Sequence, residues 1–341
     1  VHVETPKFEG KDGAVTPSSE KPMVLVDPKT GKALGASALA MKDGKEVGTY
    51  TVDEATGKVT FTPNKDFTGI ADPIVVQVIE KATGKAIAGL KYTPTVTPVT
   101  PTGEDVTSTG KQGKVQTGTP KFTEGDAEVP LKVDADQPAK FVVNGTAVED
   151  TTIDATKEGA KVGTYTINPL SGEVTFTPNK DFVGTPDAVS VQVKDENGTS
   201  VTAKYTPTVT AVTPTGEDVT STGKQGKVQT GTPKFTEGDE EVPLKVDADQ
   251  PAKFVVNGSA VDDTTIDALK EGTKVGTYTI DPLTGEVTFT PNKDFVGTPD
   301  AVTVQVKDEN GTTVTAKYTP TVTAVTPTGE DVTSTDVQGK T

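Results

Sequence analysis

The acidic side chains of this chain recur in close pairs, a spacing that can support two kinds of chemistry. Two carboxylates can act as the general acid and base of glycoside hydrolysis, and carboxylate oxygens are preferred ligands of Ca²⁺. Acidic pairs are also the ordinary content of solvated turns and sheet edges, and we favour this interpretation because most charge runs are solvated. The recurring pairs are Asp134 and Asp136 with Asp247 and Asp249, and Asp195-Glu196 with Asp308-Glu309.

The chain lacks the residues that histidine- and cysteine-dependent catalysis requires. His2 is the only histidine and there is no cysteine, which excludes a Ser-His-Asp triad, a thiolate nucleophile, a disulfide and a thiolate metal site. Glu217-Asp218 is a nearly isolated acidic pair at one of the joins, so a stiffening Ca²⁺ there stays open. We predict no enzymatic activity, no cofactor, and no catalytic, cofactor-binding or metal-binding residue.

A covalent cross-link between lysine and asparagine is a further candidate chemistry. It needs a buried lysine, a nearby acid, and an Asn or Asp on the partner strand. Lys121 and Lys234 stand early enough in their repeats, but the closing strand, VTAKYTPTVT, offers no Asn or Asp. Asn197 and Asn310 belong to turn signals. Because lysine is normally solvated, we predict that no such cross-link forms.

The charge balance and the scarcity of apolar residues exclude further classes of partner. The 341 residues have a formal net charge of −16 and no arginine, whereas nucleic-acid binding needs positive charge to meet the phosphates. No apolar run approaches the about 18 residues of a membrane span. Aromatic residues are only 5% of the chain. We therefore assign these aromatic residues to the core rather than to an exposed sugar-stacking platform: Tyr165, Phe176, Phe182 and Tyr205.

The chain is a tandem array of a unit of 113 residues. The string PTGEDVTST starts at Pro101, Pro214 and Pro327, and the later two copies are nearly identical, whereas the first has diverged. Such a period is typical of repeated domains that stack in a row. The predicted modules are 1–100, 101–213 and 214–326, followed by 327–341 as the start of a next repeat or a terminal extension.

Alternating apolar and polar residues predict an all-β module. Threonine and valine dominate the alternation, as expected of a soluble, strand-favouring face rather than of an O-glycan carrier. Turn signals stand between the strands at Pro169–Gly172, Asn144-Gly145 and Asn197-Gly198. We expect roughly seven short strands per repeat, the spacing typical of β-sandwiches. The best helix signal, Thr151–Gly159, predicts one short turn at most.

The joins between repeats are proline-rich and predict an extended chain. Pro94 and Pro101 flank the first join, and Pro207 and Pro214 flank the second, which restricts both to extended conformations. Thr220–Lys227, with the sequence TSTGKQGK, fits either a flexible linker or a loose first strand, and we expect a short ordered join. The sequence begins in mid-motif without a signal peptide or anchor, so we expect a piece of a longer array.

Four motifs in a fixed order resemble one known family. They are TGTPKF, GTYTIDPLTGEVTFTPNKDFVG, VTVQVKDENGTTVTAKYTPTVT and PTGED. In this order they are similar to the CshA-type fibril repeat of cell-wall-anchored adhesins in streptococci and related Gram-positive bacteria. The resemblance covers essentially all of the second and third copies and the later part of the first, which departs from it over residues 9–47.

The resemblance implies three β-sandwich modules in an extended rod that projects an adhesive tip away from the cell wall. In that family, binding of host ligands is associated with a non-repetitive tip, which this sequence lacks. The implied location is the extracellular cell surface, and the implied partners are the neighbouring repeats and the tip, with any host protein unknown. We expect a monomer that binds neither nucleic acid nor membrane. The alternative function is direct binding of a host protein or of neighbouring cells by the repeats themselves.

Overall fold

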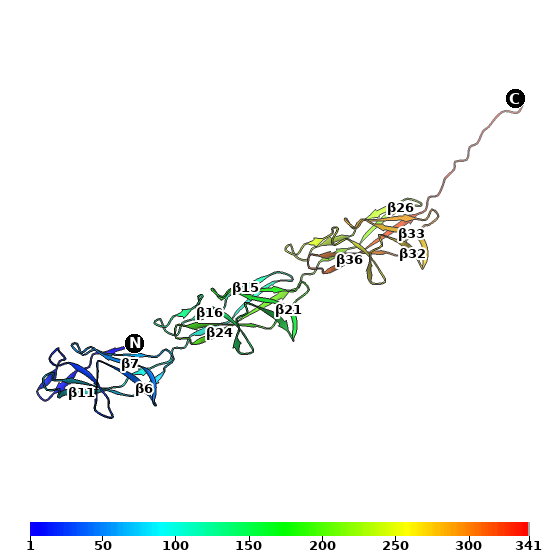
Figure 1. Ribbon diagram of the computed structural model, residues 1–341. Coiled ribbons are helices and arrows are strands. Elements are labelled where there is room, and N and C mark those ends of the chain that lie inside the picture. The colour runs from blue at the N-terminus through cyan, green and yellow to red at the C-terminus, as the bar shows by residue number, and fades with distance from the viewer. Residues whose placement is uncertain (340–341) are drawn as a thin grey trace.

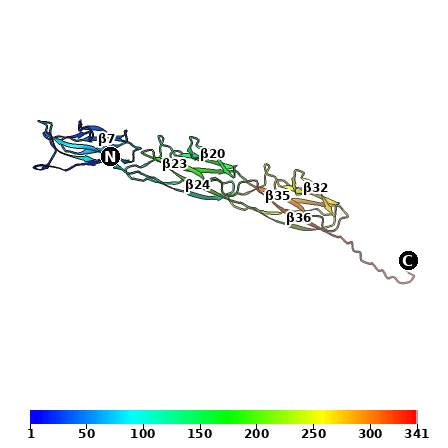
Figure 2. The ribbon, with the colours of Figure 1, turned by 90° about the horizontal axis from the view of Figure 1, so that it is seen from below.

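The computed structural model describes residues 1–339, and these residues form strands and turns without a helix. None of them could therefore cross a membrane as a helix. Figures 1 and 2 show three modules in a row, with the N-terminus in the first and a C-terminal tail leaving the third. The prediction of an all-β protein built as an extended rod of three sandwiches is confirmed.

Within residues 1–339 each module contains twelve strands, more than the seven expected, because many are only two or three residues long and leave no alternating pattern. The first module has β1 (His2–Glu4), β2 (Phe8–Gly10), β3 (Gly13–Val15), β4 (Met23–Val26), β5 (Ala33–Gly35), β6 (Ser37–Lys42), β7 (Lys45–Val52), β8 (Val59–Pro63), β9 (Gly69–Ile70), β10 (Ile74–Ile79), β11 (Ala86–Tyr92) and β12 (Thr95–Val96). The second has β13 (Thr102–Glu104), β14 (Val106–Lys111), β15 (Gln116–Gly118), β16 (Lys121–Thr123), β17 (Leu131–Lys132), β18 (Lys140–Val143), β19 (Thr146–Ala147), β20 (Thr152–Lys157), β21 (Ala160–Ile167), β22 (Val174–Pro178), β23 (Val189–Asp195) and β24 (Ser200–Thr210). The third has β25 (Thr215–Glu217), β26 (Val219–Lys224), β27 (Gln229–Gly231), β28 (Lys234–Thr236), β29 (Leu244–Lys245), β30 (Lys253–Val256), β31 (Ser259–Val261), β32 (Thr265–Lys270), β33 (Thr273–Ile280), β34 (Val287–Pro291), β35 (Val302–Asp308) and β36 (Thr313–Thr323).

Two sheets enclose the core of each module. In the second module the four-stranded sheet β15-β22-β21-β20 packs against a sheet in which β14, β24, β23, β18 and β19 follow one another and β17 pairs with β23. The inward side chains of both sheets form one apolar cluster around Tyr165, Phe176 and Tyr205. The ring centroids of Tyr165 lie 5.2 Å from Phe176 and 6.3 Å from Tyr205. The assignment of these aromatic residues, and of Phe182, to the core is confirmed.

The predicted turns join the strands that the alternation indicated. Pro169–Gly172 connects β21 to β22, and Asn144-Gly145 connects β18 to β19 with positive φ angles of 52° and 79°. In the Asn197-Gly198 turn only the glycine, at φ 89°, has a positive φ. The weak helix signal at Thr151–Gly159, which allowed one short turn at most, gives no helix, because residues 152–157 form β20 and pair with β21. There Ala155 faces the core, and Glu158 and Gly159 turn the chain with positive φ.

The expectation that Thr220–Lys227 forms a short ordered join is wrong, and the alternative of a strand near the start of the module is confirmed. Most of it belongs to β26, and the equivalent segment of the second module is β14; we call these two the clasp strands. Each is the second strand of its module and pairs in parallel with the strand that closes it, so that Val106 lies opposite Tyr205 and Val219 lies opposite Tyr318. A partner about 99 residues away leaves no local signal, which is why the polar, glycine-containing sequence looked like a linker.

A small polar network fastens each clasp strand to the core. The hydroxyl of Ser108 lies 2.7 Å from the Tyr205 hydroxyl and donates to Gln116 Oε1 at 2.6 Å. Gln116 Nε2 in turn donates to the carbonyl of Thr208 in β24 at 3.1 Å. The third module repeats the network with Ser221, Gln229 and Tyr318. The clasp strand thereby covers the tyrosine and becomes the edge strand of its sheet.

We predict that Ser221→Ala loosens the third module alone. The substitution leaves half-buried partners of the serine unsatisfied, at a cost of about 1–2 kcal/mol, which corresponds to about 5–30-fold faster native-state exchange. Hydrogen exchange followed by mass spectrometry would show the change in residues 219–224 and 318–323, while residues 106–111 serve as the internal reference. Thr222→Ala, on the exposed side of β26, is the matched control. Equal exchange in Ser221→Ala and Thr222→Ala would contradict the role given to the network.

Candidate functional site: the junction between modules

The carboxylate pairs singled out in the sequence lie in turns and not in an acid–base arrangement. Asp134 Oδ1 accepts hydrogen bonds from the backbone N–H groups of Gln137 and Asp136, both at 2.9 Å. These bonds, that of Gln137 first, lower the pKa of the Asp134 carboxyl below its usual value. Asp247 makes the same turn in the third module. The carboxylate of Asp134 is therefore used to hold the backbone.

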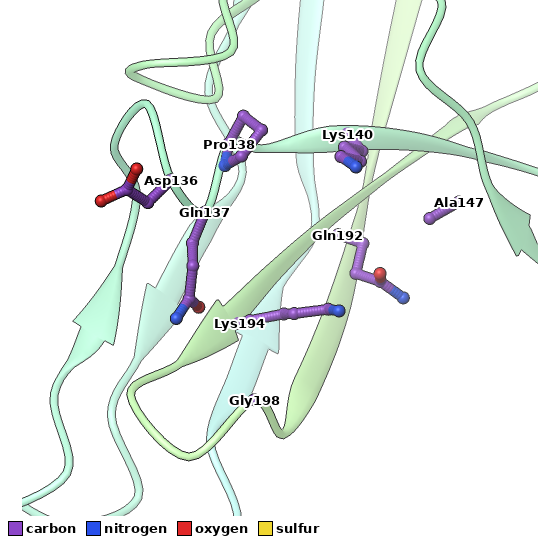
Figure 3. Close-up of a pocket in the computed structure, with 8 residues that line it drawn as sticks. All are labelled: Asp136, Gln137, Pro138, Lys140, Ala147, Gln192, Lys194 and Gly198. Carbon is purple, nitrogen blue, oxygen red and sulfur yellow. The ribbon is translucent and has the colours of Figure 1, made fainter.

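A hollow of about 310 Å³ lies beside this turn, and its lining does not fit glycosidase chemistry. Figure 3 shows that the carboxylate of Asp136 points away from the other lining residues, whereas the side chains of Lys140, Gln192 and Lys194 gather on the sheet. Asp136 is the only acid among the lining residues, so the second carboxylate that glycoside hydrolysis requires is not brought to it. The hollow is a feature of the surface between the turn and the sheet.

Asp195 and Glu196 have separate positions despite being neighbours. Asp195 is fully buried, and its Oδ1 accepts the N–H of Thr199 at 2.7 Å, which closes the loop between β23 and β24. Glu196 is exposed, and its backbone N–H bonds to the carbonyl of Pro130. Asp308 and Thr312 repeat the closure in the third module. This closure shapes the loop 308–312, which reaches the preceding module.

The contact between the second and third modules centres on the end of a clasp strand. In loop 308–312, Asn310 Nδ2 donates to the backbone carbonyl of Gln112 at 2.7 Å, across 198 positions of sequence. Gly113 lies against the same asparagine, and a Cβ atom there would come within 2.7 Å of Asn310 Cγ. The positive φ of Gly113, 78°, turns the chain back toward its own module. The side chain of Asn310 thus occupies space beside Gly113 that any larger residue at this position would fill; we call Gln112 and Gly113 the seat of Asn310.

Gln112 connects this contact to the linker. Its backbone N–H donates to the carbonyl of Thr210, and its side-chain Nε2 donates to the carbonyl of Lys180 at 3.1 Å. Its Oε1 accepts the N–H of Val212, which lies in the linker, at 3.3 Å. With 7% exposure, Gln112 is one of the few buried polar residues among residues 1–339. One side chain therefore joins the clasp strand, the module body and the outgoing chain.

Two further contacts restrict the same junction. Lys111 Nζ lies 3.2 Å from Asp239 Oδ2 of the third module, a partly exposed ion pair of modest value. Backbone hydrogen bonding from Glu241 and then the lysine lower the pKa of Asp239. Gly238 lies against the linker backbone, since a Cβ atom there would come within 2.5 Å of the Thr213 carbonyl carbon. Linker and module are therefore in van der Waals contact.

The junction between the first and second modules repeats the contact between a glycine and the linker backbone, but the loop of the following module makes a different hydrogen bond there. Gly125 lies against Thr100 as Gly238 lies against Thr213. Lys65 Nζ donates to the carbonyl of Glu196 at 3.2 Å. Between the modules lies a groove of about 670 Å³, whose lining includes His2, Lys65, Val99 and Asn197. No clasp strand ends there among the described residues.

Of the residues considered for metal binding and cross-linking, Asp218 hydrogen-bonds to the backbone, and Lys121 and Lys234 are exposed to solvent. Asp218 Oδ1 accepts the N–H of Lys317 at 2.7 Å, which fixes the start of the clasp to the closing strand. Residues 1–339 contain no group of three or more acidic or imidazole side chains able to hold a metal ion. Lys121 and Lys234 are exposed on β16 and β28, so neither is the buried lysine that an isopeptide bond requires.

The sequence reading missed the residues that matter at the junction. Gln112 and Gly113 were not singled out, their equivalents lay in the segment Thr220–Lys227 that was expected to be a join, and Asn310 was assigned to a turn. The signal that was available is the repetition of the strings KQGK and DENG at the same place in successive repeats. Nothing local indicates that one string binds the other in the following module.

We predict that Gly113→Ala changes the angle between the second and third modules, whereas Gly226→Ala does not. Both glycines have positive φ, 78° and 72°, so the local strain of about 1 kcal/mol is shared. Only Gly113 abuts another module, since no atom lies within 4 Å of a Cβ built on Gly226. Spin labels on Leu170→Cys and Leu283→Cys, exposed leucines in a chain without cysteine, report the distance. Identical distance distributions in both alanine variants would refute this role.

We predict that the intact mass of the chain equals the mass of its sequence. Each isopeptide bond releases one molecule of ammonia, so cross-links would appear as a deficit in multiples of that mass. The exposure of Lys121 and Lys234 gives the reason to expect none. Intact-mass spectrometry decides the matter, and a deficit of one or more ammonia masses would show that another lysine forms the bond.

Comparison with known proteins places the chain in a family. Residues 1–96, 98–209 and 211–322 each match the family described as the surface adhesin CshA repetitive domain. No curated protein matches.

Among solved structures, the titin I9–I11 tandem is 12% identical, and the alignment covers 92% of this chain and 91% of that chain with a TM-score of 0.31. A tetra-tandem repeat from the extending region of a large adhesion protein aligns with 15% identity, 91% of this chain, 68% of that chain and a TM-score of 0.23. These superpositions are too loose to carry an argument, and the assignment rests on the three family matches. The chain belongs to the family of surface adhesin CshA repetitive domains, of which it contains three copies.

Proposed function

We propose that these repeats are the load-bearing stalk of a surface adhesin, a structural and non-enzymatic role at the extracellular face of the cell wall. In this role they hold an adhesive tip, carried elsewhere in the protein, away from the cell. The observation that supports the proposal best is the parallel pairing of the clasp strand with the closing strand. Host ligands would be bound by the tip.

The clasp suits a stalk because of the direction in which it is loaded. The chain enters the second module through the short strand β13, continues directly into the start of β14, and leaves after the end of β24. A pull on the two ends therefore slides the parallel strands past each other along their length. Because the strands pair over six residues, from Val106 opposite Tyr205 to Lys111 opposite Thr210, several hydrogen bonds must break together. Peeling, in which bonds break one at a time, would need less force.

The junctions and the charge support an extended array. The contacts of Asn310 with Gln112 and of Lys111 with Asp239 hold successive modules in line. The net charge of −16 makes modules repel one another, although salt screens this repulsion beyond about 8 Å. Each module contacts only its neighbours, so further repeats lengthen the rod without changing its parts.

We further propose module boundaries at 1–100, 101–213 and 214–326, with 327–341 as the start of a next repeat. The pairing of β14 with β24 supports a second module that begins before residue 106 and extends beyond residue 210. The pairing of β26 with β36 supports the same limits one repeat later.

We predict two strong unfolding events and one weaker event when single molecules are pulled from their ends. Within residues 1–339 the second and third modules have clasp strands, and no clasp strand is present in the first. Val219→Asp, which places a charge where Val219 packs against the core, is expected to convert one strong event into a weak one. The reference is Thr222→Asp, on the exposed side of the same strand. Three equal events in the parent chain would contradict the mechanical role of the clasp.

We predict a rod in solution and no adhesion by the repeats alone. At a rise of 3.3 Å per residue, a module built on strands of up to about 10 residues is roughly 35 Å long. Three modules end to end, with their joins, form a rod of about 120–150 Å, whose radius of gyration is about 35–45 Å. A compact globule of this length gives about 20 Å. Small-angle scattering at low protein concentration and physiological salt distinguishes the two.

Beads coated with this chain are expected to bind host proteins no better than bare beads, and strong binding would favour the repeats themselves as the adhesive part.

A further inference from the structure

We propose that Asn310 is a deamidation site that responds to the opening of the junction between the second and third modules. While the junction is closed, the hydrogen bond from Asn310 to the second module protects the side-chain amide. When the junction opens, the amide converts to a carboxylate, and the loop no longer fits its seat. The inference goes beyond the stalk function and does not depend on it, because thermal motion and load both open the junction.

Asn310 belongs to an Asn-Gly pair, the dipeptide in which asparagine deamidates most readily. Glycine allows this reaction because it has no side chain to hinder close approach to its backbone nitrogen. The chain has four such pairs, which are Asn144-Gly145, Asn197-Gly198, Asn257-Gly258 and Asn310-Gly311. Among them, Asn310 is the one whose side-chain amide donates a hydrogen bond to another module within residues 1–339.

The reaction needs only the chain and water. The backbone nitrogen of Gly311 attacks Cγ of Asn310, and the C–N bond of the side-chain amide breaks. The amide nitrogen leaves as ammonia with the proton of the backbone N–H, and a cyclic succinimide remains. Water then opens the ring at either carbonyl and gives aspartate or isoaspartate. Ammonia is exchanged for water without oxidation or reduction, so an aged chain gains mass, whereas an isopeptide bond would lower it.

The closed junction restrains both nitrogens that take part. The leaving nitrogen, Asn310 Nδ2, donates to the backbone carbonyl of Gln112 at 2.7 Å. The attacking nitrogen, that of Gly311, donates to the carbonyl of Asp308 at 2.9 Å. The side chain of Asn310 is also half-buried and lies against Gly113. Because deamidation requires both nitrogens to be released, the closed junction slows it.

The junction opens more easily than either module unfolds. Figure 1 shows that successive modules meet only at their ends. Besides the bond of Asn310, their contact includes the partly exposed ion pair of Lys111 with Asp239 and the packing of Gly238 on the linker. Each module, in contrast, is held by two sheets around an apolar core. Since local openings need less free energy than global unfolding, Asn310 is released while both modules stay folded.

Deamidation prevents the junction from closing again in the same way. The amide nitrogen is the donor in the bond to Gln112, whereas a carboxylate has only acceptor oxygens. The carbonyl of Gln112 would lose this donor and face a second acceptor. Lys111 is already paired with Asp239, so the new carboxylate competes for it. Isoaspartate displaces the loop further, because it adds a methylene group to the backbone. Each deamidated junction therefore stays altered.

The first test follows deamidation of the full chain during incubation at neutral pH, by peptide mapping with mass spectrometry. Gly113→Ala puts a methyl group where the side chain of Asn310 lies. It should raise the rate at Asn310 about 5–30-fold, the factor that corresponds to one lost hydrogen bond. Gly226→Ala, at a positive φ with no atom near its Cβ position, is the matched control and should leave this rate unchanged. The exposed Asn144 and Asn257 report on the second and third modules themselves and should react equally in all chains.

A second variant covers the case in which Gly113→Ala loosens a whole module, which a parallel rise at Asn144 or Asn257 would reveal. Lys111→Ala removes the partly exposed ion pair with Asp239 and leaves the glycine unchanged. It should raise the rate at Asn310 alone, by about two- to fivefold. The proposal is overturned if neither variant raises the rate at Asn310 without a parallel rise at the two reference asparagines.

The second test examines what the product does to the junction. Asn310→Asp supplies the aspartate product directly. With spin labels on Leu170→Cys and Leu283→Cys, this variant should broaden the distribution of distances between the second and third modules. Asn257→Asp, at an exposed position of the same module, adds the same charge and should leave the distribution unchanged. If Asn310→Asp gives the distribution of the parent chain, deamidation does not hold the junction open, and the proposal is wrong.

Discussion

The parallel pairing between the clasp strand near the start of a module and the strand that closes it is the contact on which the rest of this structure depends. It joins residues about 99 positions apart and pairs the closing strand β24, which β14 then separates from the sheet edge. It also buries the closing tyrosine through the network of Ser108, Gln116 and Tyr205. The ends of the module are thereby joined directly, so a load on the chain passes through the clasp before it reaches the core.

The same strand determines how modules follow one another. The clasp strand ends at Gln112-Gly113, which contacts both the outgoing linker and Asn310 of the next module. Each module thus contributes a loop at one end and a seat at the other. Because Asp308 shapes the loop from inside its own core, the orientation of the junction is coupled to the folding of each module.

The first module builds the same fold from a divergent sequence. Its two-layer fold, its aromatic core and its hairpins persist, and the divergent residues 9–47 supply β4, whose four residues are all buried. What changes is the edge, where the closing strand is interrupted and Tyr92 is partly exposed. The divergent residues therefore build the same two-layer core, to which the clasp pairing of the second and third modules adds a parallel strand.

The sequence by itself determined the features that depend on neighbours in the chain. Alternation predicted the strands around Tyr165, Phe176 and Tyr205, the Asn-Gly and Pro–Gly signals predicted the turns, and the repeated strings predicted three modules in a row. Local signals failed where the partner was distant. For Thr220–Lys227 the sequence left a linker and a loose first strand open, and the expected join is wrong because glycine and polar residues mask a strand whose partner lies a whole module away. The weak helix signal at Thr151–Gly159 is overridden by the pairing with β21, which makes the segment extended. The bond between Gln112 and Asn310 spans 198 positions and two modules, so only the tertiary structure could bring these residues together. The physical reason is that a parallel pairing or a junction contact is specified by two separate segments at once, and neither segment has a pattern of its own.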